Sequence, residues 1–438
     1  MTRAGSIFAR ARGEGGQPAG PLRSRRVFVN TGDRSPDDDP AAVTAATAPA
    51  PEELDEASVL LDAPPPRNVA ILTVQEHDKR LFSLQGMSGI DGMDGFGPTG
   101  PRNQPDIRLA DRAQGEKQKS KVEPKNLIGI MNGFSEENDE LRSWINKRRT
   151  AAGGDLHLVI TDFTGCEIPW ELLTLPSRGG APETYLGATV SITRWHDLGY
   201  AHTFRGRLPL FTDEELTGHV AAFVDKTLKG GATEKTEKGV LTDLHATLDE
   251  RLEQLRNRLG RPEAGFALVY LACHGDAEPP SPFDYALEAR DGSGDRLTVG
   301  DLKGRTLQLF VQSRAIVFIN ACHSGRMLQD EIYLKSKYLR GFPDVFLRKG
   351  AVGVIGTTGF VNSEFAAKMG AWFLQELRTT GELEPVSELL RRWRAKVLSE
   401  LPAERSEQDN AYLLNAFMYV YYGNPLARLR ITEGEGPS

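Results

Sequence analysis

The chain has 438 residues, more than the roughly 250–300 that one hydrophobic core usually serves, so more than one structured region is expected. Its formal charge of −7 comes from 60 acidic and 53 basic side chains without long basic blocks, which gives no support to nucleic-acid binding. Three cysteines exclude a disulfide framework, and neither a signal-peptide core nor an apolar run of about 18 residues occurs. We therefore expect a cytoplasmic protein with no nucleic-acid and no membrane partner.

The first part of the chain combines a low-complexity tail with a small structured region. Residues 1–66 are rich in Gly, Pro, Ala and Asp and keep no apolar period, which predicts a disordered tail. Residues 67–205 are expected to form an α/β region with a long loop rich in Gly and Pro between Gly86 and Pro105. The elements expected there are a capped helix at 135–145 and strands at 69–74, 156–162 and 188–194.

Strands and helices alternate through residues 206–432, which we expect to form the main domain. This alternation is typical of a mostly parallel sheet flanked by helices, with right-handed crossovers. The stretch 226–240 has no apolar period and is expected to be an exposed loop. The expected strands are 219–224, 266–273, 285–290, 315–321, 351–356 and 417–422, and the expected helices are 241–259, 338–348, 363–378 and 385–400.

Two of the apolar runs end in residues that carry chemistry, His274 and Cys322. Neighbouring parallel strands would place both side chains outside the carboxyl ends of the strands, where open α/β folds have their sites. There an imidazole can act as the base for a thiol nucleophile. Cys322 follows His274 by 48 residues, close to the roughly 50 residues of caspase-type enzymes. The sequence therefore predicts a cysteine peptidase that uses no metal and no other cofactor.

The residues around this pair leave room for a peptide backbone. Ala321 and Gly325 add little bulk beside Cys322. Gly275 and Cys322 each offer a backbone N–H in a tight turn, and two such donors can bind the oxygen of a substrate carbonyl. We expect Gly275 and Cys322 to form the oxyanion hole.

Other roles for these residues fit the spacing less well. A zinc site would take ligands from Cys273, His274, Cys322 and His323, but consecutive strand residues point to opposite faces and no C-x-x-C spacing occurs. His323 is for the same reason expected to project away from Cys322. Cys166 lies in a turn without a basic neighbour in the sequence, which favours a structural thiol.

Five short segments occur in a characteristic order along the chain. They are Ile-Pro-Trp-Glu-Leu-Leu at 168–173, Leu-Ala-Cys-His-Gly at 271–275, Asn-Ala-Cys-His-Ser-Gly at 320–325, the strand and turn at 350–357, and Tyr-Val-Tyr-Tyr-Gly-Asn-Pro at 419–425. Together they resemble the CHAT domain, a caspase-like peptidase family related to separase and the metacaspases. The resemblance extends over about residues 135–430.

This resemblance implies a caspase-hemoglobinase-like fold, with His274 as general base and Cys322 as nucleophile. The intermediate it implies is a thioester with a protein or peptide substrate. In bacteria such domains are often effectors in programmed proteolysis or antiviral defence. A latent zymogen is therefore expected, with an activating protease or a sensor protein as its partner.

The sequence departs from the metacaspase pattern in the expected substrate pocket. Metacaspases carry Asp two residues before the nucleophile, where it lines a pocket for Arg or Lys, and this chain has Asn320 there. The preference for a basic residue is thus left open, although Asp276, Asp162 or Glu167 can supply an acid. Asn320, Asp276 and Ser324 are expected to contact the substrate.

Two questions about activity stay open at this level. Basic clusters at 23–26 and 147–149, and the segment 326–340 after the nucleophile, are candidates for processing or for a mobile activation loop. The alternative to a peptidase is an inactive caspase-fold module that uses its groove to bind peptides.

Overall fold

The computed structural model describes one compact unit within Pro51–Ser438. The tail predicted at 1–66 lies outside the described residues, apart from Pro65 and Pro66. The described residues are 65–78, 81–90, 95–105, 107, 123–162, 164, 166–176, 184–195, 211–228, 232–276, 279, 281–329, 339–378 and 382–432.

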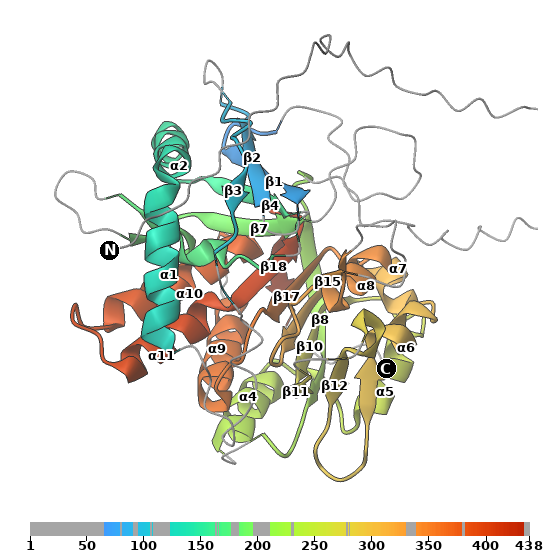
Figure 1. Ribbon diagram of the computed structural model, residues 1–438. Coiled ribbons are helices and arrows are strands. Elements are labelled where there is room, and N and C mark those ends of the chain that lie inside the picture. Colours follow the sequence, from blue (N-terminus) through green and yellow to red (C-terminus); the bar gives the residue numbers. More distant parts are fainter. Residues whose placement is uncertain are drawn as a thin grey trace, which may run out of the picture. The chain divides into compact units, whose positions relative to one another are not determined.

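A large and mostly parallel sheet forms the centre of the structure (Figure 1). Neighbouring strands run parallel except at the pairs β17/β18, β1/β2 and β2/β3. A further strand, β9 (Thr247–Asp249), pairs with β8 beside β19. The spatial order is β19 (Arg428–Ile431), β8 (Glu215–Val224), β10 (Phe266–Ala272), β14 (Ile316–Asn320), β17 (Gly353–Thr357), β18 (Tyr419–Gly423), β7 (Ser191–Trp195), β4 (His157–Asp162), β1 (Val69–Asp78), β2 (Leu81–Ser88) and β3 (Arg102–Asn103).

Both faces of the sheet are covered by helices, which explains why its central strands are apolar throughout. In β10, Leu268 and Tyr270 belong to one hydrophobic cluster, whereas Val269 and Leu271 belong to the other. The first face carries α1 (Pro124–Glu137), α2 (Asp139–Ala151), α4 (Ala232–Asp243), α9 (Ser363–Glu376), α10 (Val386–Glu400) and α11 (Glu407–Phe417), and the second carries α5 (Leu252–Leu259), α6 (Val299–Lys303), α7 (Gln308–Ser313) and α8 (Phe342–Arg348) (Figure 1).

The fold class expected from the sequence is confirmed, and most strands lie within a few residues of their predicted positions. The region 67–205 contributes strands to the same sheet as 206–432, because β18 pairs with β7. The boundary between these two regions stays a prediction. None of the described helices is both long enough and apolar enough to cross a membrane.

Several local predictions were wrong. The stretch 226–240 is not a loop throughout, because α4 begins at Ala232. The helix expected at 241–259 is three elements, since the chain leaves α4 through His245, which has a φ of 51°, and then forms β9 and α5. The leucine spacing continues across this break, so the helical period alone could not reveal it.

The basic cluster at 147–149 lies within α2 rather than in a flexible segment. Arg148 is buried, with its guanidinium 5.3 Å from the ring centre of Trp144. This packing argues against a processing site there, because cleavage sites concentrate in exposed loops. The basic cluster at 23–26 and residues 330–338 of the candidate segment 326–340 lie outside the described residues.

Smaller elements complete the region around the carboxyl ends of the strands. A three-stranded antiparallel sheet joins β11 (His274–Gly275), β12 (Ala286–Glu288) and β13 (Arg296–Thr298). A two-stranded pair joins β15 (Leu328–Gln329) to β16 (Leu339–Arg340). These elements follow directly after β10 and β14 and therefore frame the site described next.

Candidate active site

Three neighbouring parallel strands bring chemistry to one edge of the sheet. Ala272 of β10 pairs with Val224 of β8 on one side and with Asn320 of β14 on the other. The residues that follow these register partners therefore emerge together at the carboxyl ends of the strands. They include His274 and Cys322, as the sequence predicted.

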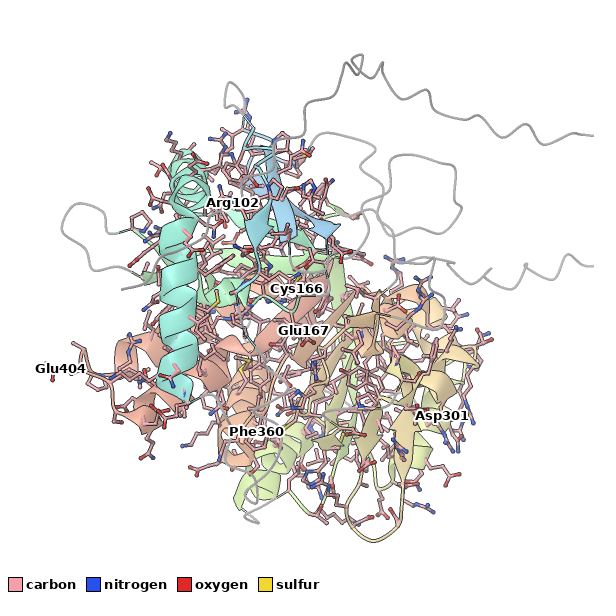
Figure 2. All side chains as sticks on the ribbon, in the orientation of Figure 1. Arg102, Cys166, Glu167, Asp301, Phe360 and Glu404 are labelled. Atoms are coloured by element: carbon pink, nitrogen blue, oxygen red, sulfur yellow. The ribbon has the colours of Figure 1, made fainter. Side chains whose placement is uncertain are left out.

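His274 and Cys322 line one cavity of about 370 Å³. The loop between β17 and α9 contributes Phe360 and Val361 to its wall, and Phe360 is 48% exposed. Figure 2 labels Phe360 near the ends of α9 and α4. The cavity is also lined by Leu228, Glu237, Cys273, Arg290, Asn320, Ala321, Asn362, Ser363 and Ala366.

Asp225 is a third residue at this edge, and our reading of the sequence missed it. It follows β8 directly, is 1% exposed, and places Oδ2 3.7 Å from His274 Nε2. Its two oxygens also accept hydrogen bonds from the amide and hydroxyl of Thr227 and from the amide of Arg290. A carboxylate held in this way can orient the imidazole of His274. The available signal was an acidic residue immediately after the predicted strand 219–224.

Gly275 packs directly against the peptide of Cys322. A Cβ at Gly275 would lie 1.8 Å from the carbonyl oxygen of Cys322, so a side chain cannot be accommodated without a backbone shift. This contact ties the turn after β10 to the turn after β14. Gly275 therefore lies beside the peptide of Cys322, and its role in an oxyanion hole stays a prediction.

The thiol of Cys322 contacts the loop before α9 rather than His274. Cys322 Sγ lies 3.6 Å from the carbonyl oxygen and 3.5 Å from the amide nitrogen of Val361, and no hydrogen bond joins Cys322 to His274 in the described structure. Burial raises the pKa of the Cys322 thiol. Burial and the nearby positive charge of Arg290 lower the pKa of His274. Both shifts favour a neutral thiol beside a neutral imidazole over an ion pair.

Asn320 lies in the wall of the cavity but is held by its neighbours. Its Nδ2 donates to Glu237 Oε1 at 2.8 Å and to the carbonyl oxygen of Ala366 at 2.9 Å, and its Oδ1 accepts from the hydroxyl of Tyr419 at 2.6 Å. The hydroxyl of Tyr270 completes the network. With its amide engaged in this way, Asn320 serves chiefly to fix Glu237. Glu237 is a cavity residue that the sequence analysis did not single out.

The other residues considered from the sequence lie away from the cavity. Ser324 is buried, donates to the carbonyl oxygen of Ile319 and accepts from the amide of Thr357, so it supports the turn and gives no support to the expected substrate contact. Asp276 is not among the residues that line the cavity, and its Oδ2 lies 3.9 Å from Arg296 Nη2. Neither residue therefore lines the space that His274 and Cys322 share.

The remaining candidate acids and bases have internal roles. His323 is buried with a φ of 59°, and burial lowers its pKa to about 3, which argues against a role as the base. Asp162 accepts from the hydroxyl of Thr164 at 2.6 Å. Glu167, labelled beside Cys166 in Figure 2, forms a two-pronged ion pair with Arg326. In the described part of the chain, no group of three His, Cys, Asp or Glu side chains is arranged to hold a metal ion.

A cysteine and a histidine that follow adjacent parallel strands and line one cavity have the arrangement that a caspase-like peptidase requires. Residues 200–417 match the family model described as the CHAT domain, so the resemblance found in the sequence is confirmed. The matched range is narrower than the expected 135–430. No curated protein matches the sequence.

Solved structures of caspase-like peptidases are similar to this chain only loosely. Two crystal structures of the Saccharomyces cerevisiae separase–securin complex match with 15% and 12% identity, cover 66% and 83% of this chain, and have TM-scores of 0.38 and 0.47. The chain spans 17% and 30% of those separase chains. A complex of the Porphyromonas gingivalis RgpB pro- and mature domains matches with 12% identity and a TM-score of 0.37, covering 68% of this chain and 69% of that chain. At such scores the assignment depends on the family match.

Proposed function

We propose that the protein is a cysteine endopeptidase of the CHAT type that cleaves protein substrates. The observation that carries this proposal is the shared cavity of His274 and Cys322 at the ends of adjacent parallel strands, backed by Asp225. The family match adds support for this class of protein. The predicted cytoplasmic location and the role in bacterial proteolytic signalling or antiviral defence belong to the same proposal.

The reaction begins from neutral partners. His274 takes the proton of the Cys322 thiol as the sulfur attacks the substrate carbonyl, and the resulting imidazolium is stabilised by the negative charge of Asp225. The amides of Gly275 and Cys322 bind the oxyanion. Collapse of the tetrahedral intermediate releases the amine, which receives the proton from His274. Water then hydrolyses the thioester and regenerates the thiol.

The contact between Cys322 and Val361 is the basis for a latent state. The sulfur must rotate away from the peptide of Val361 to reach His274, and movement of the loop before α9 would release it. An activating protease or a sensor protein that repositions this loop fits the family's regulation. The activity of the purified chain is therefore expected to rise when such a partner is added.

The decisive experiment maps new amino termini in a cell lysate after addition of the full chain. Cleavage sites are expected with the native protein and with Asp276→Asn, and none with Cys322→Ala. Cleavage that persists in Cys322→Ala would contradict the proposal.

A second candidate is an inactive module that binds peptides, and the missing Cys322–His274 hydrogen bond favours it. Alkylation by iodoacetamide separates the two. Burial raises the pKa of Cys166 to about 12 and that of Cys273 still further, so both are expected to react slowly. A peptidase predicts one faster thiol, Cys322, that His274→Ala slows by about tenfold or more. Three equally slow thiols would support the module.

A further inference from the structure

Glu237 is a buried acid in the cavity wall that the proposed mechanism does not use. It lies on α4 and is 1% exposed, and its Oε1 accepts hydrogen bonds from the hydroxyl of Tyr270 and from Asn320. Gly370 of α9 closes over this group, because a Cβ there would lie 2.1 Å from the Tyr270 oxygen and 2.7 Å from Glu237 Oε1. The carboxylate is thus fixed in place from several elements.

The second oxygen of Glu237 is left for a ligand. In the described structure Oε1 accepts hydrogen bonds from Tyr270 and Asn320, and none is made to Oε2. Because Glu237 lines the cavity, this oxygen is the acceptor that a bound side chain can use. A cationic donor that reaches this oxygen forms a charge-assisted hydrogen bond, which is stronger than one between neutral groups.

The nucleophile and this acid line the same cavity. Asn320, the last residue of β14, stands two positions before Cys322 and donates a hydrogen bond to Glu237 Oε1 at 2.8 Å. Leu228, Val361 and Ala366 give the cavity an apolar wall, which suits an aliphatic stem.

The cavity also holds a positive charge, because Arg290 lines it together with Glu237. Arg290 lowers the pKa of both His274 and Cys322. It is not among the groups that shift the pKa of Glu237. The charge of Arg290 therefore acts chiefly on the reacting groups.

We propose, on the basis of the peptidase function above, that Glu237 selects the residue before the cleaved bond and that the selected residue is lysine. The ammonium group needs one acceptor and sits on a flexible four-carbon stem. A guanidinium binds carboxylates best through two parallel hydrogen bonds, and here one of the two oxygens is already occupied. The acid therefore replaces the Asp that metacaspases carry at the position of Asn320, and it discriminates between the two basic side chains.

Burial supports this assignment by raising the pKa of Glu237 to about 7. Without a ligand the carboxyl carries only part of its charge near neutral pH. A lysine side chain that enters the cavity stabilises the ionised form.

Protection of Cys322 from iodoacetamide tests the pocket without requiring catalysis. Nα-acetyl-lysine amide is expected to slow the alkylation of Cys322 at a concentration about 10- to 100-fold lower than the uncharged norleucine or the arginine counterpart. Glu237→Gln should remove this advantage, because the amide keeps the hydrogen bonds from Tyr270 and Asn320 but loses the charge. Glu364→Gln, an exposed acid outside the cavity, should change nothing. Equal protection by the norleucine or arginine compound would overturn the proposal. So would a Glu237→Gln variant in which the lysine compound keeps its advantage.

Cleavage of peptides that differ only before the cut provides the second arm. Lysine is expected to exceed arginine and methionine about tenfold or more in kcat/KM, and Glu237→Gln should abolish this preference by lowering kcat/KM for the lysine peptide. A kcat/KM for the arginine or methionine peptide equal to or above that of the lysine peptide would refute the lysine assignment and leave the peptidase intact. Lysine-specific protection without any cleavage would refute the peptidase and leave the lysine pocket.

Discussion

Asp225 places a carboxylate oxygen 3.7 Å from His274, and in the proposed peptidase it orients the imidazole. We predict that Asp225→Asn lowers the rate of substrate cleavage by about 100-fold or more, because the substitution removes the charge that stabilises the imidazolium. The negative charge of Asp225 raises the pKa of His274, so this pKa should fall in the variant. The pH profile of kcat/KM measures that displacement, which loss of packing alone would not produce. Asp276→Asn is the control, and an unchanged profile in Asp225→Asn would exclude the positioning role.

Glu237 makes the stability of the protein depend on pH. Its pKa is about 7 in the folded protein and 4.5 as the ordinary value, so between these pH values the folded state holds a proton that the unfolded chain has released. The free energy of unfolding is therefore expected to fall by about 3 kcal/mol as the pH rises through this window, and to stay constant above it. In the Glu237→Gln variant the free energy of unfolding should not show this fall as the pH rises. Urea unfolding at pH 5 and pH 8 measures the difference, with Glu364→Gln as the control.

The turns after β10 and β14 act as one element because Gly275 and Cys322 are in contact. We predict that Gly275→Ala lowers the free energy of unfolding by about 1–3 kcal/mol, since the added Cβ would meet the Cys322 carbonyl oxygen at 1.8 Å. It should also displace the nucleophile and reduce cleavage. Gly239→Ala in α4 is a matched control, because no atom lies within 4 Å of its Cβ, and it should stabilise the helix slightly. Chemical unfolding of both variants gives the comparison, and equal effects would contradict this account of Gly275.

The sheet was predictable from the sequence because its strands are nearly uninterrupted apolar runs, and this fixed the positions of His274 and Cys322. Asp225 could have been predicted by the same reasoning, because it follows a predicted strand. The role of Glu237 in the cavity could not have been predicted in this way. Residues 226–240 show no apolar period, and the carboxyl is buried by contacts with β10, β14 and α9 that are distant in sequence. The break of the expected helix 241–259 likewise depends on the pairing of β9 with β8.

An ion pair joins the part of the chain before the CHAT match to the segment that follows the nucleophile. Arg326 Nε lies 2.6 Å from Glu167 Oε1, and Nη2 lies 2.8 Å from Oε2, with Arg326 7% exposed. We predict that Glu167→Gln lowers the free energy of unfolding by about 3 kcal/mol, because it removes one partner of a largely buried pair. Glu364→Gln, which breaks an exposed pair with Lys368, should cost less than about 0.5 kcal/mol. Comparable losses in the free energy of unfolding would show that the Glu167–Arg326 pair stabilises the protein no more than an exposed ion pair does.

The wall that faces the thiol is assembled from separate pieces of chain, since Glu237 comes from α4 and Cys322 from the end of β14. Changes in α4 can therefore alter which peptides are accepted without disturbing the groups that break the bond. Exchange of α4 alone is therefore the first step for changing the substrate preference of such an enzyme by design. Duplicated copies of the gene can also diverge in substrate preference through changes in this helix.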